Sequence, residues 1–253
     1  MRNAYVSAED ALTLPGLRIA FTRGYPGPWS EAVKAIFEIK RIDYVPVVQE
    51  AGGANETLYR WTGQRSAPVA MFEDERPRAL WSEMIMLAER LAPDPPMLPA
   101  DQDERAAMFG LCHEICGEDG LGWNARALAF AAAEGDARSP AGPLRARFAD
   151  GADVDHARIR VNAVIGMLAR RLTAQRDVGR RYFIGTRLSA ADIYWTTFSN
   201  FFASMPASIC PMPDAYRAMA EVCAAALDRP LPPILVVHRD DILERYFTLP
   251  MSF

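Results

Sequence analysis

Two cysteines and a histidine stand close together in this chain of 253 residues, in a pattern that could hold a metal. Cys112 is followed by His113 and then by Cys116, and thiolates and imidazoles are ligands that zinc prefers. On a helix, Cys112 and Cys116 share one face, whereas His113 lies on another. Because no second ligand pair with matching spacing exists, we expect buried free thiols and no bound metal.

Hydroxyl groups gather where a predicted strand is followed by a predicted helix. Residues 17–22 alternate as a strand does, and residues 32–40 carry an apolar stripe at helical spacing. Thr22, Tyr25 and Ser30 lie around this junction, where the partial positive charge of a helix N-terminus favours an anion. Two alternatives stay open: Ser30 caps an amide of the first helical turn, or Tyr25 is simply exposed on its loop.

A further polar pair, Ser82 and Glu83, stands at the start of a predicted helix over residues 84–91. At a helix N-terminus the hydroxyl can bind a carboxylate, and the glutamate can bind an ammonium group. In the alternative interpretation Ser82 is the N-cap and Glu83 interacts favourably with the helix dipole. The sequence leaves both interpretations open.

The composition is that of an ordinary globular protein, with 50% hydrophobic and 24% charged residues. A formal net charge of -4 and the lack of a basic stripe argue against a nucleic-acid partner. No apolar run approaches the roughly 20 residues that span a bilayer, and residues 1–14 lack the pattern of a secretory signal. The four scattered cysteines are too few for a disulfide scaffold, so we expect reduced thiols and a cytoplasmic location.

The clearest boundary is residues 92–100, where four prolines stop any helix or interior strand. The segment before it reads as β-α-β, a loose segment and β-β-α, which predicts an α/β layered domain over residues 15–93. Its predicted elements are strand 17–22, helix 32–40, an edge strand at 44–48 that contains Pro46, hairpin strands 69–72 and 78–80, and helix 84–91.

The segment after the boundary, residues 99–253, reads as an all-helical domain with a C-terminal tail. Asp101 with Glu104, and Ser189 with Asp192, form capping boxes. The other expected features are a helix break at 117–122 with a new helix near Trp123, a polar loop over 134–153, a strongly amphipathic helix around 161–172, and a tail over 230–253 that packs across the surface.

Three motifs together resemble the glutathione transferase superfamily, and the resemblance covers residues 17–227. The first is Ser66-Ala67-Pro68-Val69 before the hairpin, and the second is Phe183-Ile-Gly-Thr-Arg-Leu-Ser-Ala-Ala-Asp-Ile-Tyr194, with its capping box. The third is Leu87-Ala-Glu-Arg-Leu-Ala-Pro93 followed by Leu98-Pro99. The resemblance implies a thioredoxin-like N-terminal domain that binds glutathione and an all-α C-terminal domain.

The resemblance also implies roles for particular residues. Pro68 would be a cis-proline, and the main chain of Ala67 would pair with the cysteinyl part of glutathione. Ser82 and Glu83 would hold the γ-glutamyl end. The family places a thiolate-stabilising Ser or Cys at the first position of Gly27-Pro28-Trp29-Ser30, where this chain has Gly27, so Tyr25 or Ser30 is the candidate donor.

In the family, the helix after the linker lines the acceptor side of the site. Trp123, Asn124 and Arg126 are therefore candidates to meet the acceptor, although a tryptophan at a helix start is more often simply buried. The resemblance implies a homodimeric detoxification enzyme that joins the glutathione thiol to a small hydrophobic electrophile. The alternative is a catalytically silent binding module, which Gly27 keeps open. A glutathione-dependent reductase or lyase fits less well, because the N-terminal domain has no cysteine.

Overall fold

A computed structural model describes residues 4–132 and 151–253 of the chain. Two compact units can be separated: the first is Met1–Pro95 together with Ser252–Phe253, and the second is Pro96–Met251. The predicted loop at 134–153 lies almost entirely outside the described residues. In the described part of the chain, no helix combines the length and the apolar character needed to span a membrane.

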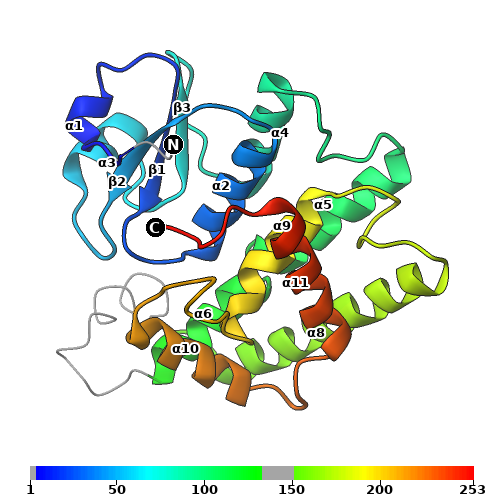
Figure 1. The fold of residues 1–253 in the computed structure, drawn as a ribbon. Coiled ribbons are helices and arrows are strands. Elements are labelled where there is room, and N and C mark those ends of the chain that lie inside the picture. Colours follow the sequence, from blue (N-terminus) through cyan, green and yellow to red (C-terminus); the bar gives the residue numbers. More distant parts are fainter. Residues whose placement is uncertain (1–3, 133–150) are drawn as a thin grey trace. The chain divides into compact units, whose positions relative to one another are not determined.

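The first unit contains a three-stranded sheet in the order β2-β1-β3. Its elements are α1 (Ala8–Ala11), β1 (Leu17–Thr22), α2 (Pro28–Ile39), β2 (Val45–Gln49), α3 (Glu56–Thr62), β3 (Val69–Phe72) and α4 (Trp81–Leu91). Strand β1 pairs in parallel with β2 and antiparallel with β3. Figure 1 shows α2 and α4 on one side of this sheet and α1 and α3 on the other.

Alternation along the strands gives the sheet two buried faces. On the face towards α1 and α3, Ala20, Val47 and Met71 belong to one apolar cluster with Leu58 of α3. The neighbouring β1 residue Phe21 has the opposite orientation, and its ring packs edge-on against Tyr44 at 5.6 Å between centroids. Burial on both faces explains why a strand as short as β1 is almost entirely inaccessible.

Three local features of the first unit differ from the sequence prediction. The segment expected to be loose contains helix α3, which is only 7 residues long and buries Leu58 and Thr62. The second hairpin strand is reduced to one bridge, in which Ala70 and Arg78 exchange main-chain bonds of 2.8 and 2.9 Å. Residues 4–14, left outside the predicted domain, also belong to the first unit.

The prediction that β2 is an edge strand is confirmed, and the chain itself covers part of that edge. Val6 donates its amide to the carbonyl of Pro46 at 3.0 Å, and its own carbonyl accepts from Val48 at 2.9 Å. Because Pro46 has no amide hydrogen, it fits only where the ladder needs no donor from it. This single bridge satisfies main-chain groups that an open edge would leave unpaired.

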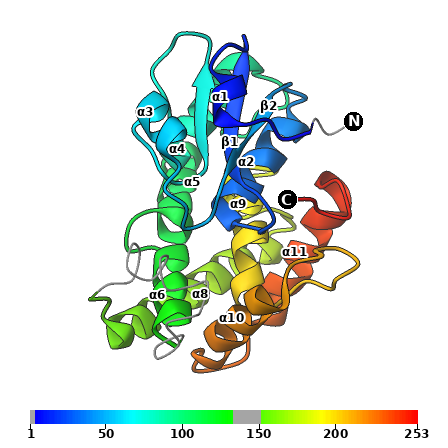
Figure 2. The same cartoon turned by 90° about the vertical axis from the view of Figure 1, so that its left-hand side faces the viewer.

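The second unit is built of helices. Its elements are α5 (Gln102–Cys116), α6 (Leu121–Ala132), α8 (Val154–Asp177), α9 (Ala190–Phe198), the 3-10 helix η1 (Ser199–Phe201), α10 (Asp214–Ala225) and α11 (Pro233–Tyr246). All residues of α9 are buried, and this helix packs against α5 and α11. Figure 2 shows α9 in yellow beside α11 in red. The segment 230–253, expected as a tail that packs across the surface, consists mostly of helix α11, which packs against α8 and α9.

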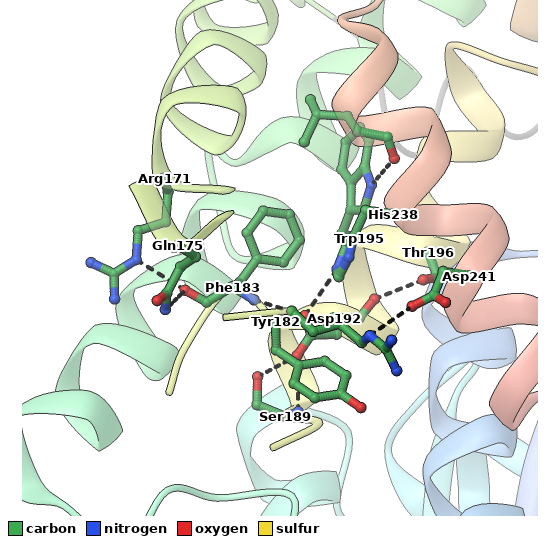
Figure 3. A network of polar contacts seen from close by, with 12 residues as sticks. Arg171, Gln175, Tyr182, Phe183, Ser189, Asp192, Trp195, Thr196, His238 and Asp241 are labelled. Atoms are coloured by element: carbon green, nitrogen blue, oxygen red, sulfur yellow. Dashed lines mark hydrogen bonds and ion pairs between the residues drawn. The ribbon is translucent and has the colours of Figure 1, made fainter. Parts of the chain in front are cut away.

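The start of α9 is held by a buried polar network that surrounds Asp192 (Figure 3). One carboxylate oxygen accepts from the amide of Phe183 at 3.0 Å and lies 2.9 Å from Nε2 of His238. The other oxygen accepts from the amide and the hydroxyl of Ser189, at 2.9 and 2.8 Å. The predicted capping box is thus confirmed, and it extends to α11 through His238, which the sequence analysis did not include.

Candidate functional site

The junction between β1 and α2 presents two hydroxyls that the fold does not use. Gly27 is the N-cap of α2, and its carbonyl accepts from the amide of Glu31 at 2.9 Å. Ser30 is 2% exposed, and Tyr25 is 37% exposed. Neither hydroxyl has a hydrogen-bond partner among the described residues. Both therefore remain available beside a helix N-terminus, where an anion is favoured.

The capping role considered for Ser30 is wrong, because no side chain caps this helix start. The third hydroxyl of the junction is already used: Thr22 donates to Oε1 of Gln49 at 2.7 Å. Its proton is thus committed to a partner inside the unit. Of the three hydroxyls around this junction, Tyr25 and Ser30 are the two that can donate to a ligand.

Gly27 stands at the position for which the resemblance in the sequence implies a hydroxyl or a thiol. Its φ is -61°, which any residue can adopt. A Cβ atom built there would have only one neighbour within 4 Å, the Ser30 hydroxyl oxygen at 3.9 Å. The missing side chain is therefore not forced by the backbone or by crowding.

The loop before β3 presents main-chain groups beside half-exposed side chains. The Ala67–Pro68 peptide bond is cis, as expected from the sequence. Pro68 is buried, whereas Ala67 is partly exposed and its main chain has no hydrogen bond among the described residues. Two residues earlier, the carbonyl of Arg65 accepts from Gln49 at 3.0 Å and from Asn55 at 3.3 Å. The side-chain amides of Gln49 and Asn55, which no sequence pattern indicated, thus hold this loop through the carbonyl of Arg65.

Ser82 and Glu83, at the start of α4, differ in their hydrogen bonding: the Ser82 hydroxyl has no partner among the described residues, whereas the Glu83 carboxylate has several. The N-cap is Leu80, so the interpretation of Ser82 as N-cap is wrong. Glu83 accepts from the amides of Ala79 and Leu80 at 3.2 and 3.3 Å. Its other oxygen lies 2.7 Å from the guanidinium of Arg76.

The electrostatics of Glu83 agree with this structural use. Partial burial raises the pKa of its carboxyl group, but the Arg76 guanidinium and the two main-chain amides outweigh that effect and leave the pKa below its usual value. The hydroxyl of Ser82, by contrast, has no partner among the described residues. The geometry therefore favours Ser82 over Glu83 as a ligand-binding group.

The three candidate residues of the second unit, Asn124, Trp123 and Arg126, differ in exposure and in hydrogen bonding. Asn124 is 6% exposed, and its amide donates to the carbonyls of Asp119 and Gly120, both at 2.9 Å. This side chain fastens the turn before α6, which speaks against a role in binding. Trp123 is 39% exposed rather than buried, and the Arg126 guanidinium lies 4.4 Å from its ring centroid. These two remain the candidates on α6.

All four cysteines are free and buried. Burial raises the pKa of the Cys112 and Cys116 thiols well above the ordinary value, and the Cys116 thiol donates to the carbonyl of Cys112 at 2.9 Å. Both thiols thus behave as core groups. Within residues 4–132 and 151–253, no cluster of three or more His, Cys, Asp or Glu side chains is arranged to hold a metal ion.

Neither a protein-family model nor a curated protein sequence matches the chain. Many solved structures match. One is a glutathione S-transferase from Methylobacterium radiotolerans in complex with glutathione sulfonate, with 20% identity over 94% of this chain and 95% of that chain and a TM-score of 0.63. Another is the β-etherase LigF from Sphingobium, with 16% identity over 91% of this chain and 96% of that chain and a TM-score of 0.65.

A third is a glutathione S-transferase from Methylobacillus flagellatus with glutathione bound, with 14% identity over 94% of this chain, 100% of that chain and a TM-score of 0.65. At such low identity the likeness concerns the fold. The chain therefore has the fold of the glutathione S-transferases, with a thioredoxin-like unit and an all-helical unit.

Proposed function

We propose that the chain binds glutathione in its first unit and transfers the thiol to a small hydrophobic electrophile. The observation that carries the proposal is the unpartnered hydroxyl of Ser30, a largely buried residue in the first turn of α2, with the Tyr25 hydroxyl on the preceding loop. Two solved structures of the same fold contain glutathione or its sulfonate, which supports this ligand class.

In the proposed reaction, the glutathione thiol loses its proton to solvent and the thiolate is stabilised at the start of α2. A hydrogen bond from Tyr25 or Ser30 and the helix N-terminus both favour the anion. The main chain of Ala67 would pair with the cysteinyl part, and Ser82 would bind the γ-glutamyl carboxylate. The sulfur then forms a bond to an electrophilic carbon, and the leaving group departs with its bonding electrons. Trp123 and Arg126 are kept as the proposed contacts of the electrophile.

Titration calorimetry with millimolar glutathione tests the binding step. We expect a measurable heat for the folded protein and conjugation of an activated aryl halide in the presence of glutathione. Heat without turnover would favour the second candidate, a silent glutathione-binding module. That candidate rests on Gly27, which lacks the hydroxyl of the family position. A folded protein that gives no heat would refute both.

The proposal extends to assembly and location. We infer a homodimer, as the resemblance implies, and sedimentation of the purified chain would test this directly. We also infer a cytoplasmic location, because none of the four cysteines forms a disulfide. A monomer at micromolar concentration would contradict the first inference without affecting the proposed chemistry.

A further inference from the structure

Gln49 lies at the carboxyl end of β2 and connects two segments of the candidate site. Gln49 is buried, with 4% of the residue exposed. Oε1 accepts from the Thr22 hydroxyl at 2.7 Å. Nε2 donates to the carbonyls of Glu50 at 2.8 Å and of Arg65 at 3.0 Å. One neutral side chain thus uses both amide protons and its oxygen inside the unit.

The network fixes the orientation of this amide. If the amide were flipped, Oε1 would face two carbonyl oxygens and Nε2 would face the Thr22 hydroxyl. That arrangement would lose both bonds to the carbonyls of Glu50 and Arg65 and leave like dipoles in contact. Gln49 therefore holds the Thr22 hydroxyl and the Arg65 carbonyl in one fixed geometry, because only one orientation of its amide makes all of these bonds.

The two partners belong to different parts of the candidate site. Thr22 is three residues before Tyr25 and leads into α2, and the amide of the intervening Arg23 donates to the main-chain carbonyl of Gln49 at 3.1 Å. Arg65 is two residues before Ala67. The first segment carries the proposed thiolate donors, and the second carries the main chain proposed to pair with the cysteinyl part.

We propose that Gln49 is a positioning residue that sets the spacing between the thiol-stabilising loop and the peptide-pairing loop. This inference rests on the proposed function. In this proposal Gln49 acts through its bonds to Thr22 and Arg65 rather than by its own contact with glutathione. A catalytic geometry must be held to a fraction of an ångström, so a buried side chain that ties two loops together affects binding and thiol ionisation at once.

The test compares Gln49→Met, Thr22→Val and Lys40→Met with the wild type. Gln49→Met removes both ties, and Thr22→Val removes only the tie to the thiol-stabilising loop. Lys40 is a control for a general loss of stability, because this buried side chain donates to the main-chain carbonyls of Ala92 at 2.6 Å and Pro95 at 2.8 Å and pairs with Glu89 at 2.8 Å. Those bonds lie at the C-terminal end of α2, away from the candidate site.

Glutathione affinity is measured by calorimetry, and the pKa of the bound thiol by thiolate absorbance against pH. We expect Gln49→Met to weaken affinity about tenfold, the equivalent of one lost hydrogen bond, and to raise the thiol pKa. Thr22→Val should raise the thiol pKa while affinity stays within about twofold of the wild type. Lys40→Met should lower the denaturation midpoint and leave both glutathione readouts unchanged.

Wild-type values for both readouts in Gln49→Met would overturn the inference while leaving the proposed function intact. The inference would also fail if Lys40→Met reproduced the changes, since the effect would then be a general loss of stability. If Gln49→Met does not fold, Thr22→Val alone decides through the thiol pKa. A wild-type protein that fails to bind glutathione would remove the proposed function first, and this inference with it.

Discussion

The Asp192 carboxylate of the second unit and the Ser30 hydroxyl of the first differ in how many hydrogen bonds they receive or donate. In the second unit, the Asp192 carboxylate is fully buried and has four donors, from Phe183, from His238 and, twice, from Ser189. In the first unit, Ser30 is 2% exposed and its hydroxyl has no partner among the described residues. A carboxylate whose two oxygens both accept hydrogen bonds stabilises the fold, whereas a hydroxyl without a partner in the protein can still donate to a ligand.

The same comparison distinguishes candidate side chains whose hydrogen-bonding groups are occupied within the protein from candidates that can still bind a ligand. Asn124 and Glu83 were candidates from the sequence, but the amide nitrogen of Asn124 and both carboxylate oxygens of Glu83 are occupied. Ser82 was also a candidate, and its hydroxyl has no partner among the described residues. Substitutions in both units can therefore test a simple rule. Replacing a side chain whose hydrogen bonds are all made within the protein should lower stability, and replacing one without partners should lower ligand binding.

The largest effect is expected for Asp192→Ala, which should destabilise the second unit by about 3–5 kcal/mol, because its buried donors lose their acceptor. Asp101→Ala is a matched control, since Asp101 caps α5 with one exposed bond to the Glu104 amide at 2.9 Å. It should cost about 1 kcal/mol. Chemical denaturation measures both, and equal losses would contradict the importance of saturation.

Ser82→Ala and Glu83→Ala should affect different properties. Ser82→Ala should leave the unfolding free energy within about 0.5 kcal/mol and weaken glutathione binding by about 1.5–3 kcal/mol, the value of a hydrogen bond to a charged group. Glu83→Ala should instead lower stability, because the amides of Ala79 and Leu80 lose their acceptor. Denaturation and calorimetry on the same two variants decide this, and a reversed pattern would assign the γ-glutamyl contact to Glu83.

Tyr25→Phe and Ser30→Ala test the thiolate donor. Each should leave the fold stable, because neither hydroxyl has a partner to lose. The variant that removes the true donor should raise the pKa of the bound glutathione thiol by about 1–2, since one hydrogen bond to a charged group is worth roughly 1.5–3 kcal/mol. Thiolate absorbance against pH, at saturating glutathione, identifies the donor. If neither variant changes the thiol pKa, the helix N-terminus alone stabilises the anion or the thiol is never activated.

The sequence predicted the fold well because its signals are local. Alternation in residues 17–22, Pro46 at an edge and the Ser189–Asp192 capping box each reflect contacts within a few residues. His238 escaped prediction, since it lies 46 residues from Asp192 and only the packing of α11 brings them together. Helix α3 was missed because a helix of 7 residues has too few turns to show a stripe.

The candidate site was predicted less completely, because its state depends on contacts between residues far apart in the sequence. The sequence indicated which residues carry hydroxyls near a helix start, but their availability depends on partners far along the chain. Thr22 is excluded as a donor by Gln49, which is 27 residues away. Gln49 itself gave no signal, since a polar residue at a strand end is ordinary. Saturation is a property of the folded unit and cannot be seen in a motif.

Alkaline pH should weaken the second unit through Tyr246. Burial, with a hydrogen bond to Tyr182 at 2.6 Å, raises the pKa of the Tyr246 phenol to about 12. Because the pKa is higher in the folded state than the ordinary value of 10.0, this contribution to stability is complete below about pH 10 and is lost as the pH rises towards 12. Burial raises the pKa of the Cys223 thiol to about 12 as well, from 9.0, with the same sign.

Tyr246→Phe should therefore flatten the loss of stability above about pH 10. Tyr25→Phe is the control, because it removes a tyrosine hydroxyl of the first unit that has no partner among the described residues. Denaturation midpoints from about pH 8 to about pH 12, followed by circular dichroism, give the comparison. Identical pH profiles for wild type and Tyr246→Phe would mean that other groups carry the alkaline transition.

The smallest effect on stability is expected for Gly27→Ser. A Cβ at this position meets only the Ser30 hydroxyl, at 3.9 Å, so the side chain has room. As N-cap of α2, serine should gain a few tenths of a kcal/mol over glycine, and Gly27→Ala, which adds the same Cβ without a hydroxyl, should gain nothing.

The same pair of variants addresses the silent-module alternative. If the family position can still serve the thiol, Gly27→Ser should lower the pKa of bound glutathione and raise turnover with an aryl halide, while Gly27→Ala changes neither. The added hydroxyl would join the unpartnered groups of Tyr25 and Ser30 rather than a saturated network, so its main effect should be on the ligand. A stability gain with no change in the thiol pKa would show that the new hydroxyl only caps α2. The thiolate would then be stabilised by a donor at another position, or by no side chain at all.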